Sequence, residues 1–258
     1  MVKFLIALLL LCSFSSFSFC HDESVAKSLL AKLEWQTEDY PPYNYLNSSN
    51  ELVGIFPEAL TLIYTRLGIN LNIKNIAVVP WARLIHSMKR YPEYAAFSMI
   101  STVERSKKYK LVPLPVVTKI SIMALNQNFN EISNNSIDEL NIAVVRGDIG
   151  QDLLNSQKIL AQQTETTSAF SMLEMLIYER VDAIAYSEDV AYFQLEKLGL
   201  QNSTIKPIYS LNDKSFVNFV FHKSTPSCVT NLFKEAIVKL DDEGRLKPIW
   251  QKYFKIEL

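Results

Sequence analysis

The chain has 258 residues, of which 48% are hydrophobic, 21% charged and 11% aromatic, a composition that excludes intrinsic disorder. Its 26 basic and 27 acidic residues leave a formal charge of −1, so no excess of positive charge is present to bind nucleic acid. Its six glycines form neither a GxGxxG nor a GxxxxGK[ST] phosphate-binding loop, and no nucleotide-driven activity is expected.

The first twenty residues are typical of a secretory signal peptide. A lysine near the start is followed by an apolar run over 4–11, which is shorter than the roughly 20 residues of a membrane span. We therefore expect residues 1–20 to be removed after export, and a lipid anchor on Cys20 is the less favoured alternative. Cleavage after Cys20 would leave Cys228 as the one cysteine, without a partner for an intramolecular disulfide.

Predicted strands and helices alternate along the mature chain. Apolar residues spaced by three and four predict a helix over 56–67, and Gly68 follows at the usual place for a C-cap. Strands are expected at 33–36, 71–73, 94–100, 121–125, 141–145, 181–186 and 215–221, and further helices from Pro80, after the turn at 146–151, and around 169–177, 232–240 and 246–253. This alternation predicts an α/β fold with largely parallel sheets, whose ligands bind at the carboxyl ends of the strands.

Four segments carry motifs that are specific when their order and spacing are taken together. They are 37–43 with the following 54–68, then 79–83, then 102–115, and last the chain end at 242–254. In these segments the sequence resembles the bacterial periplasmic solute-binding proteins of family 3, the polar amino-acid-binding type, in a branch with the motif Pro-Trp-x-Arg. The resemblance covers essentially the whole mature chain.

The resemblance implies a two-lobe periplasmic binding protein fold of type II, with a ligand cleft between the lobes. Lobe 1 is expected at 28–120 plus 217–258 and lobe 2 at 121–216, and the extended segments 117–125 and 216–221 suit the hinge crossings. The resemblance also implies a periplasmic monomer that closes on a small polar ligand and delivers it to a membrane ABC permease. It implies no cofactor.

The resemblance assigns the ligand-binding roles residue by residue. In the family the arginine at the position of Arg105 pairs with a ligand carboxylate, which its planar guanidinium suits, whereas an exposed arginine is the alternative. Tyr40 and Trp81 match positions where aromatic rings sandwich the ligand, with ordinary core packing as the alternative. The expected ligand-binding residues are Glu38, Tyr40, Tyr43, Trp81, Arg83, Ser98, Thr102, Arg105, Gly147, Asp148, Ile149 and Ser187; no catalytic residue and no metal ligand is expected.

Lobe 2 departs from the family pattern at two places. Amino-acid binders carry a small hydroxyl residue after the glycine at a helix start, but Gly147 is followed here by Asp148, an expected N-cap whose charge would repel a carboxylate. The family's aspartate that pairs with a ligand ammonium is replaced by Ser187, followed by Glu188. We expect a small polar ligand, amino-acid-like or carboxylate-bearing, that need not be an α-amino acid.

Two other functions remain open from the sequence. A sensory protein that reports ligand occupancy to a membrane receptor in trans would use the same cleft. A dehydratase-like enzyme on this fold would need a positioned acid or base, and Glu38, Glu58 and Glu104 are available without forming an evident pair. The chain is therefore not expected to be an enzyme.

Overall fold

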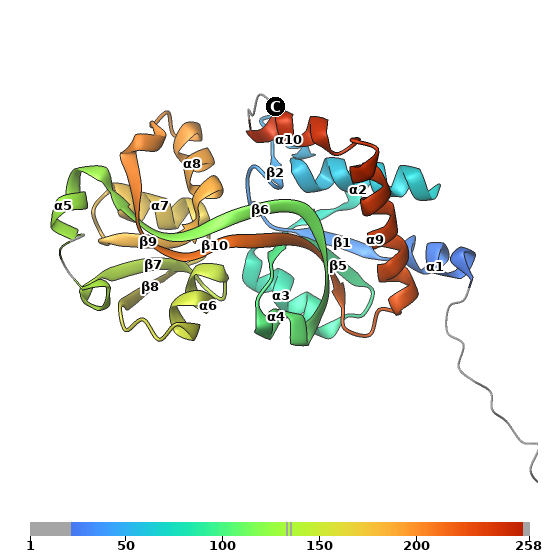
Figure 1. The fold of residues 1–258 in the computed structure, drawn as a ribbon, viewed down its shortest axis with the longest axis horizontal. Helices are drawn as coiled ribbons and strands as arrows, with labels where there is room; N and C mark the ends of the chain where they lie inside the picture. Colours follow the sequence, from blue (N-terminus) through green and yellow to red (C-terminus); the bar gives the residue numbers. More distant parts are fainter. Residues whose placement is uncertain (1–21, 133, 135, 255–258) are drawn as a thin grey trace, which may run out of the picture.

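The structure, a computed structural model, describes residues 22–132, 134 and 136–254. The expected signal peptide, 1–20, lies outside the described residues. Figure 1 shows two α/β lobes joined by a pair of long strands that runs through both of them. Among the described residues, no helix combines the length and the apolar character needed to cross a bilayer.

One eight-stranded sheet links the two lobes, in the order β4-β1-β5-β10-β6-β9-β7-β8. Its centre is the antiparallel pair β6 (Tyr109–Leu125) and β10 (Ile205–His222). The expected crossings, 117–125 and 216–221, lie within these strands. The register between β10 and β6 shifts at four places, one of them between Asn212 and Ser215. Where along β6 and β10 one lobe ends and the other begins stays a prediction.

Lobe 1 is the part that holds β4, β1 and β5, on the right in Figure 1. Both β4 and β5 run parallel to β1, and β5 is antiparallel to β10. Its elements are α1 (Glu23–Leu30), β1 (Glu34–Thr37), β2 (Tyr45–Leu46), β3 (Leu52–Val53), α2 (Ile55–Leu67), the 3₁₀ turn η1 (Ile73–Asn75), β4 (Ala77–Val78), α3 (Trp81–Arg90), β5 (Tyr94–Ile100), α4 (Val103–Lys108), α9 (Ser227–Asp242) and α10 (Lys247–Phe254).

Lobe 2 is the part that holds β9, β7 and β8. Both β8 and β9 run parallel to β7, and β9 is antiparallel to β6. Its elements are η2 (Asn126–Asn128), α5 (Phe129–Ile132), η3 (Ile137–Glu139), β7 (Asn141–Val145), α6 (Ile149–Ser156), β8 (Gln162–Thr166), α7 (Ala169–Ile177), β9 (Ala183–Ser187), α8 (Glu188–Lys197) and η4 (Asn202–Thr204).

An aromatic cluster forms the centre of lobe 1. The ring of Trp35 lies 6.0 Å from Phe97 and 5.8 Å from both Phe219 and Phe233, measured between ring centroids. Its indole N–H, buried with the ring, donates a 2.7 Å hydrogen bond to the Tyr64 hydroxyl. Aromatic packing of this kind adds to the hydrophobic burial that holds α2 and α9 against the sheet.

One predicted strand is wrong. The segment expected as a strand at 71–73 contains no strand; Asn72 caps the turn η1 by accepting a hydrogen bond from the Lys74 N–H. Cys228, at the start of α9, is disulfide-bonded, and its partner lies outside the described residues. The expectation that Cys228 lacks a partner assumed cleavage after Cys20, whereas this disulfide requires a chain that keeps Cys12 or Cys20.

Candidate functional site

The candidate site lies where the carboxyl ends of strands from both lobes face each other. In lobe 1 the loops after β1, β4 and β5 lead to residue 38, to α3 and to α4; in lobe 2 the turns after β7 and β9 lead to α6 and α8. Parallel strands present their carboxyl ends at one edge of a sheet, which is where open α/β folds bind ligands. Nearly all of the expected ligand-binding residues lie in these connections.

Trp81 and Gly147 join the two lobes directly. Trp81 is the first residue of α3, is only 3% exposed, and donates a 2.8 Å hydrogen bond from its indole N–H to the Gly147 carbonyl oxygen. Gly147 has a φ of +69°, a conformation that favours glycine. The guanidinium carbon of Arg105 lies over the ring of Trp81, 5.0 Å from the ring centroid, which is within the range of a cation–π interaction.

Arg105 is buried, with 6% exposure, so the alternative of an exposed arginine is wrong. The Thr102 side chain caps α4 by accepting the Arg105 N–H at 3.1 Å, which fixes the start of this short helix. The Arg105 side chain donates to the Ile100 carbonyl oxygen at 3.1 Å. From lobe 2, Asp152 Oδ2 lies 3.0 Å from Nη2 and Asp148 Oδ1 lies 3.6 Å away, so Arg105 forms ion pairs across the two lobes.

Asp148 occupies the N-cap of α6, as predicted. Its Oδ1 accepts a 2.6 Å hydrogen bond from the Ile149 N–H, whereas its Oδ2 is buried without a hydrogen-bond partner. Burial raises the pKa of this carboxyl, and the positive charge of Arg105 opposes that rise. Ile149 itself is 1% exposed and packs into the core of lobe 2.

Glu38 directly follows β1 and is 7% exposed. Its carboxylate has no hydrogen bond to any residue in the described part of the chain, although its backbone carbonyl accepts from Asn44 Nδ2 at 2.6 Å. Burial raises the pKa of Glu38 well above its ordinary value; the nearby charge of Asp148 adds to the rise and Arg105 opposes it. The Ser98 hydroxyl donates a hydrogen bond to Oδ1 of Asn44. Ser98, on β5, therefore anchors the loop that follows β1.

Three tyrosines pack together between the lobes. Tyr40 stacks on Tyr43 at 5.5 Å and meets the edge of Tyr186, from lobe 2, at 5.6 Å between ring centroids. The Tyr43 hydroxyl donates a 2.8 Å hydrogen bond to Asp189 at the start of α8, while the buried Tyr40 hydroxyl forms no hydrogen bond of ordinary geometry. Burial raises the pKa of all three phenols, so they are neutral at physiological pH.

Of the two remaining expected residues, Ser187 lies beside the Tyr40 hydroxyl, where it opposes the rise of that pKa, and Arg83 lies apart from the group. Ser187 is fully buried at the end of β9, where its hydroxyl is 2.8 Å from that of Thr118 on β6. Arg83 is exposed on α3, and the structure shows no ion pair or hydrogen bond between it and the described residues of the site. In this fold Arg83 lies outside the group of residues that surrounds Arg105.

Four residues of the site escaped prediction as ligand-binding residues. One of them has a readable signal: Asp152 follows Asp148 by one helical turn, so both carboxylates lie on the same face of α6. Tyr186 precedes Ser187 on β9, and its role depends on how the lobes meet. The four residues are Asn44, Asp152, Tyr186 and Asp189.

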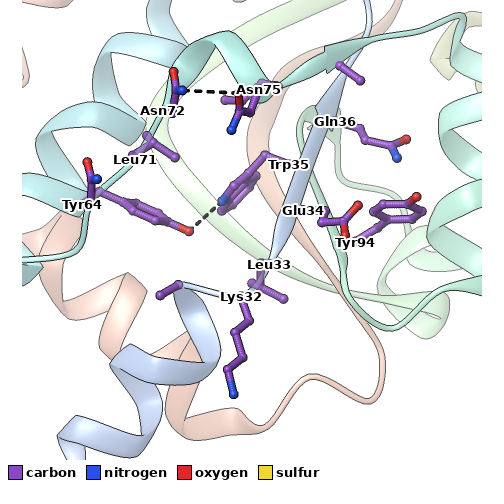
Figure 2. A pocket seen from close by; sticks show the side chains of 14 residues that line it. Lys32, Leu33, Glu34, Trp35, Gln36, Tyr64, Leu71, Asn72, Asn75 and Tyr94 are labelled. Atoms are coloured by element: carbon purple, nitrogen blue, oxygen red, sulfur yellow. Dashed lines mark hydrogen bonds between the residues drawn. The ribbon is translucent and has the colours of Figure 1, made fainter.

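Two hollows lie near these elements and differ in their relation to the site. One, of about 1130 Å³, opens between α4 and α6 and is lined by residues of both lobes, among them Arg105, Asp152 and Lys223. The other, of about 680 Å³, is drawn in Figure 2 beside Trp35 and is lined by lobe 1 alone. Only the first hollow reaches the residues that join the lobes.

Comparison with known proteins identifies a family and a fold. The profile of a family described as bacterial extracellular solute-binding proteins, family 3, matches residues 35–256. A solved amino acid ABC transporter substrate-binding protein from Streptococcus pneumoniae, bound to L-arginine, has a TM-score of 0.73 at 21% identity, covering 90% of this chain and 98% of its own. No curated protein matches the chain.

Two further solved structures share the fold. A histidine kinase sensor domain with similarity to periplasmic binding proteins has a TM-score of 0.73 at 13% identity, covering 86% of this chain and 95% of its own. An ancestral amino acid-binding protein, a precursor of cyclohexadienyl dehydratase, has a TM-score of 0.72 at 16% identity and covers 86% and 94%. At such low identity these likenesses establish the two-lobe fold and nothing finer.

Proposed function

The chain belongs to the bacterial extracellular solute-binding proteins of family 3, and from this premise we propose that it captures a small polar solute between its lobes and delivers it to an ABC transporter in the membrane. The solute would enter while the lobes are apart. Closure about the crossings in β6 and β10 would then surround it, because long strands absorb small dihedral changes over many residues.

The observation that carries this proposal is the meeting of Trp81 and Arg105 of lobe 1 with the start of α6 in lobe 2. The Trp81–Gly147 hydrogen bond and the Arg105–Asp152 ion pair link elements that are joined otherwise through the long strands. Contacts of this kind form when the lobes close and break when they open. They give the protein a means of holding a solute and of signalling closure to a membrane partner.

The expected ligand-binding residues enter the proposal in two groups. Trp81, Arg105 and the turn at Gly147 and Asp148 would meet the solute on one side. Tyr40 and Tyr43 would pack against it on the other side, since their rings already lie between the lobes. Under the expectation drawn from the resemblance, a solute carboxylate would pair with Arg105 and would have to displace Asp148 and Asp152 to do so.

The cellular setting is also part of the proposal. We infer a periplasmic monomer released by cleavage of the signal peptide, in keeping with the extracellular family to which the chain belongs. The likeness to a histidine kinase sensor domain supports a second candidate, a sensor that reports the solute to a membrane receptor. We do not propose an enzyme: the neighbours are mostly binding proteins, although one is a precursor of a dehydratase.

The test is a thermal-shift screen of the mature protein against amino acids, small carboxylates, polyamines and short peptides. A true solute stabilises the folded state by RT ln(1 + [L]/Kd), about 2.7 kcal/mol at a hundredfold excess over Kd. Small-angle X-ray scattering with the same compound should show a smaller radius of gyration. A screen without any stabilising compound would contradict the proposed function.

Transport and sensing are separated in cells. If the protein serves a transporter, deleting its gene should abolish uptake of the radiolabelled solute, and the wild-type gene should restore it. Unchanged uptake together with a lost transcriptional response to the solute would favour the sensor instead.

A further inference from the structure

We propose that the solute is a small organic cation without a carboxylate group, and that Asp148 and Asp152 impose this choice by pairing with Arg105. The inference rests on the proposed function, because it concerns the same site between the lobes. It replaces the carboxylate-bearing ligand expected from the resemblance.

Arg105 has little capacity left for a ligand carboxylate. Nε donates to Asp152 at 3.1 Å, one terminal nitrogen donates to the Ile100 carbonyl oxygen at 3.1 Å, and the other lies 3.0 Å from Asp152. That second nitrogen also donates to the Gly147 carbonyl oxygen at 3.4 Å and lies 3.6 Å from Asp148. All three guanidinium nitrogens therefore have acceptors, two of which are carboxylates of the protein itself.

The balance of charge around Arg105 is negative. Asp148 is buried and Asp152 is partly exposed, so two carboxyl groups of the protein already face one guanidinium. A ligand carboxylate would add a negative charge beside Asp148 and Asp152, and negative charge left unpaired at a buried site is costly. A ligand cation would offset the excess. Repulsion of ligand carboxylates and attraction of ligand cations would thus both favour binding of a cation that has no carboxylate.

Several buried polar groups between the lobes lack hydrogen-bond partners. Asp148 Oδ2 and the Tyr40 hydroxyl are buried without a hydrogen bond, and the Glu38 carboxylate has none among the described residues. An ammonium or guanidinium group donates several hydrogen bonds and would satisfy such acceptors. The rings of Tyr40 and Tyr186 lie beside them and offer the π faces that attract cations.

The experiment compares three pairs of compounds that differ only by one carboxylate: cadaverine with L-lysine, agmatine with L-arginine, and putrescine with L-ornithine. Binding to the mature wild-type protein is measured by isothermal titration calorimetry at neutral pH. We expect at least one amine to bind, and to bind at least tenfold more tightly than the amino acid of its pair.

The variant that tests the cause is the double substitution Asp148→Asn and Asp152→Asn. Asparagine is also a good N-cap, so α6 keeps its start while both negative charges are removed. We expect the amine to lose at least tenfold in affinity and the preference within its pair to shift toward the amino acid. Asp242→Asn, on the exposed end of α9, is the matched control and should bind as the wild type does.

Each remaining outcome has a definite meaning. Tighter binding of an amino acid than of its paired amine would overturn the cation inference and leave the proposed function standing. An amine preference that is unchanged in the double variant would overturn the role given to Asp148 and Asp152. If none of the six compounds binds, the inference fails; the wider screen of carboxylates and peptides then decides separately whether the proposed function fails as well.

Discussion

The indole N–H of Trp81 and the carbonyl oxygen of Gly147 form a 2.8 Å hydrogen bond that joins the start of α3 in lobe 1 to the turn before α6 in lobe 2. The acceptor belongs to the backbone, and its direction depends on the positive φ of Gly147, +69°. Trp81 therefore provides the side chain through which this link between the lobes can be removed with least disturbance.

Replacing Trp81 by phenylalanine should favour the open arrangement of the lobes. The variant keeps an apolar ring but loses the donor, and a net hydrogen bond contributes about 1 kcal/mol, or roughly a fivefold change in the closed-to-open ratio. The radius of gyration measured by small-angle X-ray scattering should increase. Trp250→Phe, on α10 of lobe 1, is the control and should leave it unchanged. Equal radii for the two variants would show that the Trp81 bond does not hold the lobes together.

Arg105 and Asp148 should behave as a coupled pair. Arg105→Met leaves Asp148 buried beside Glu38 without a cation, and losing one partner of a buried ion pair typically costs about 3–5 kcal/mol. Adding Asp148→Asn removes the charge while keeping the N-cap of α6 and should recover at least 1 kcal/mol. Urea unfolding of the wild type, both single variants and the double variant completes the cycle. Strictly additive losses would contradict the pairing.

The sequence predicted the parts of the fold that depend on local pattern. The helix expected over 56–67 is α2, Ile55–Leu67, because its apolar residues follow the helical period and Gly68 adopts the left-handed conformation of a C-cap. The strand expected at 71–73 failed because two alternating apolar residues are a weak signal. The Asn72 side chain instead bonds the backbone two residues ahead, which favours a turn.

Local motifs predicted individual site residues within each lobe, but not the contacts that these residues make across the two lobes. Motif positions named Tyr40, Trp81 and Arg105 as site residues, and the structure has them in or after the connections that follow β1, β4 and β5. The pairing of Arg105 with Asp152 joins residues 47 positions apart on different lobes, and nothing local in the sequence encodes it. Tyr186 was missed for the same reason: a buried tyrosine on a strand is an ordinary core residue until the opposite lobe is present.

Cys228 leads to a prediction about the start of the mature protein. It is disulfide-bonded, and the chain has only two other cysteines, Cys12 and Cys20. Cleavage after Cys20 would remove both, so we expect the exported protein to begin at or before Cys20 and to contain one disulfide. Intact-mass spectrometry should show a gain of about two mass units on reduction, as expected from two added hydrogens. A measured mass that corresponds to a chain beginning at His21 would exclude an intramolecular disulfide, because Cys228 would be its one cysteine.

Glu38 should make stability depend on pH in the direction opposite to that of an ordinary salt-bridged carboxylate. Its pKa is raised on folding above the ordinary 4.5, first by burial and then by the charge of Asp148. Above pH 4.5 the folded protein therefore holds a proton that the unfolded chain has released. The free energy of unfolding falls as pH rises toward the folded pKa, by about 1.4 kcal/mol for each unit of pKa difference.

Glu38→Gln removes this contribution and identifies its source. Well below pH 4.5 the variant and the wild type should respond to pH in parallel, because Glu38 is then protonated in both the folded and the unfolded wild type. At pH 7.5 the variant should be the more stable of the two. Asp148 also has a raised pKa, so some decline with pH will persist in the variant. Glu235→Gln, exposed on α9, should follow the wild-type curve; a parallel curve for Glu38→Gln would place the pH dependence elsewhere in the molecule.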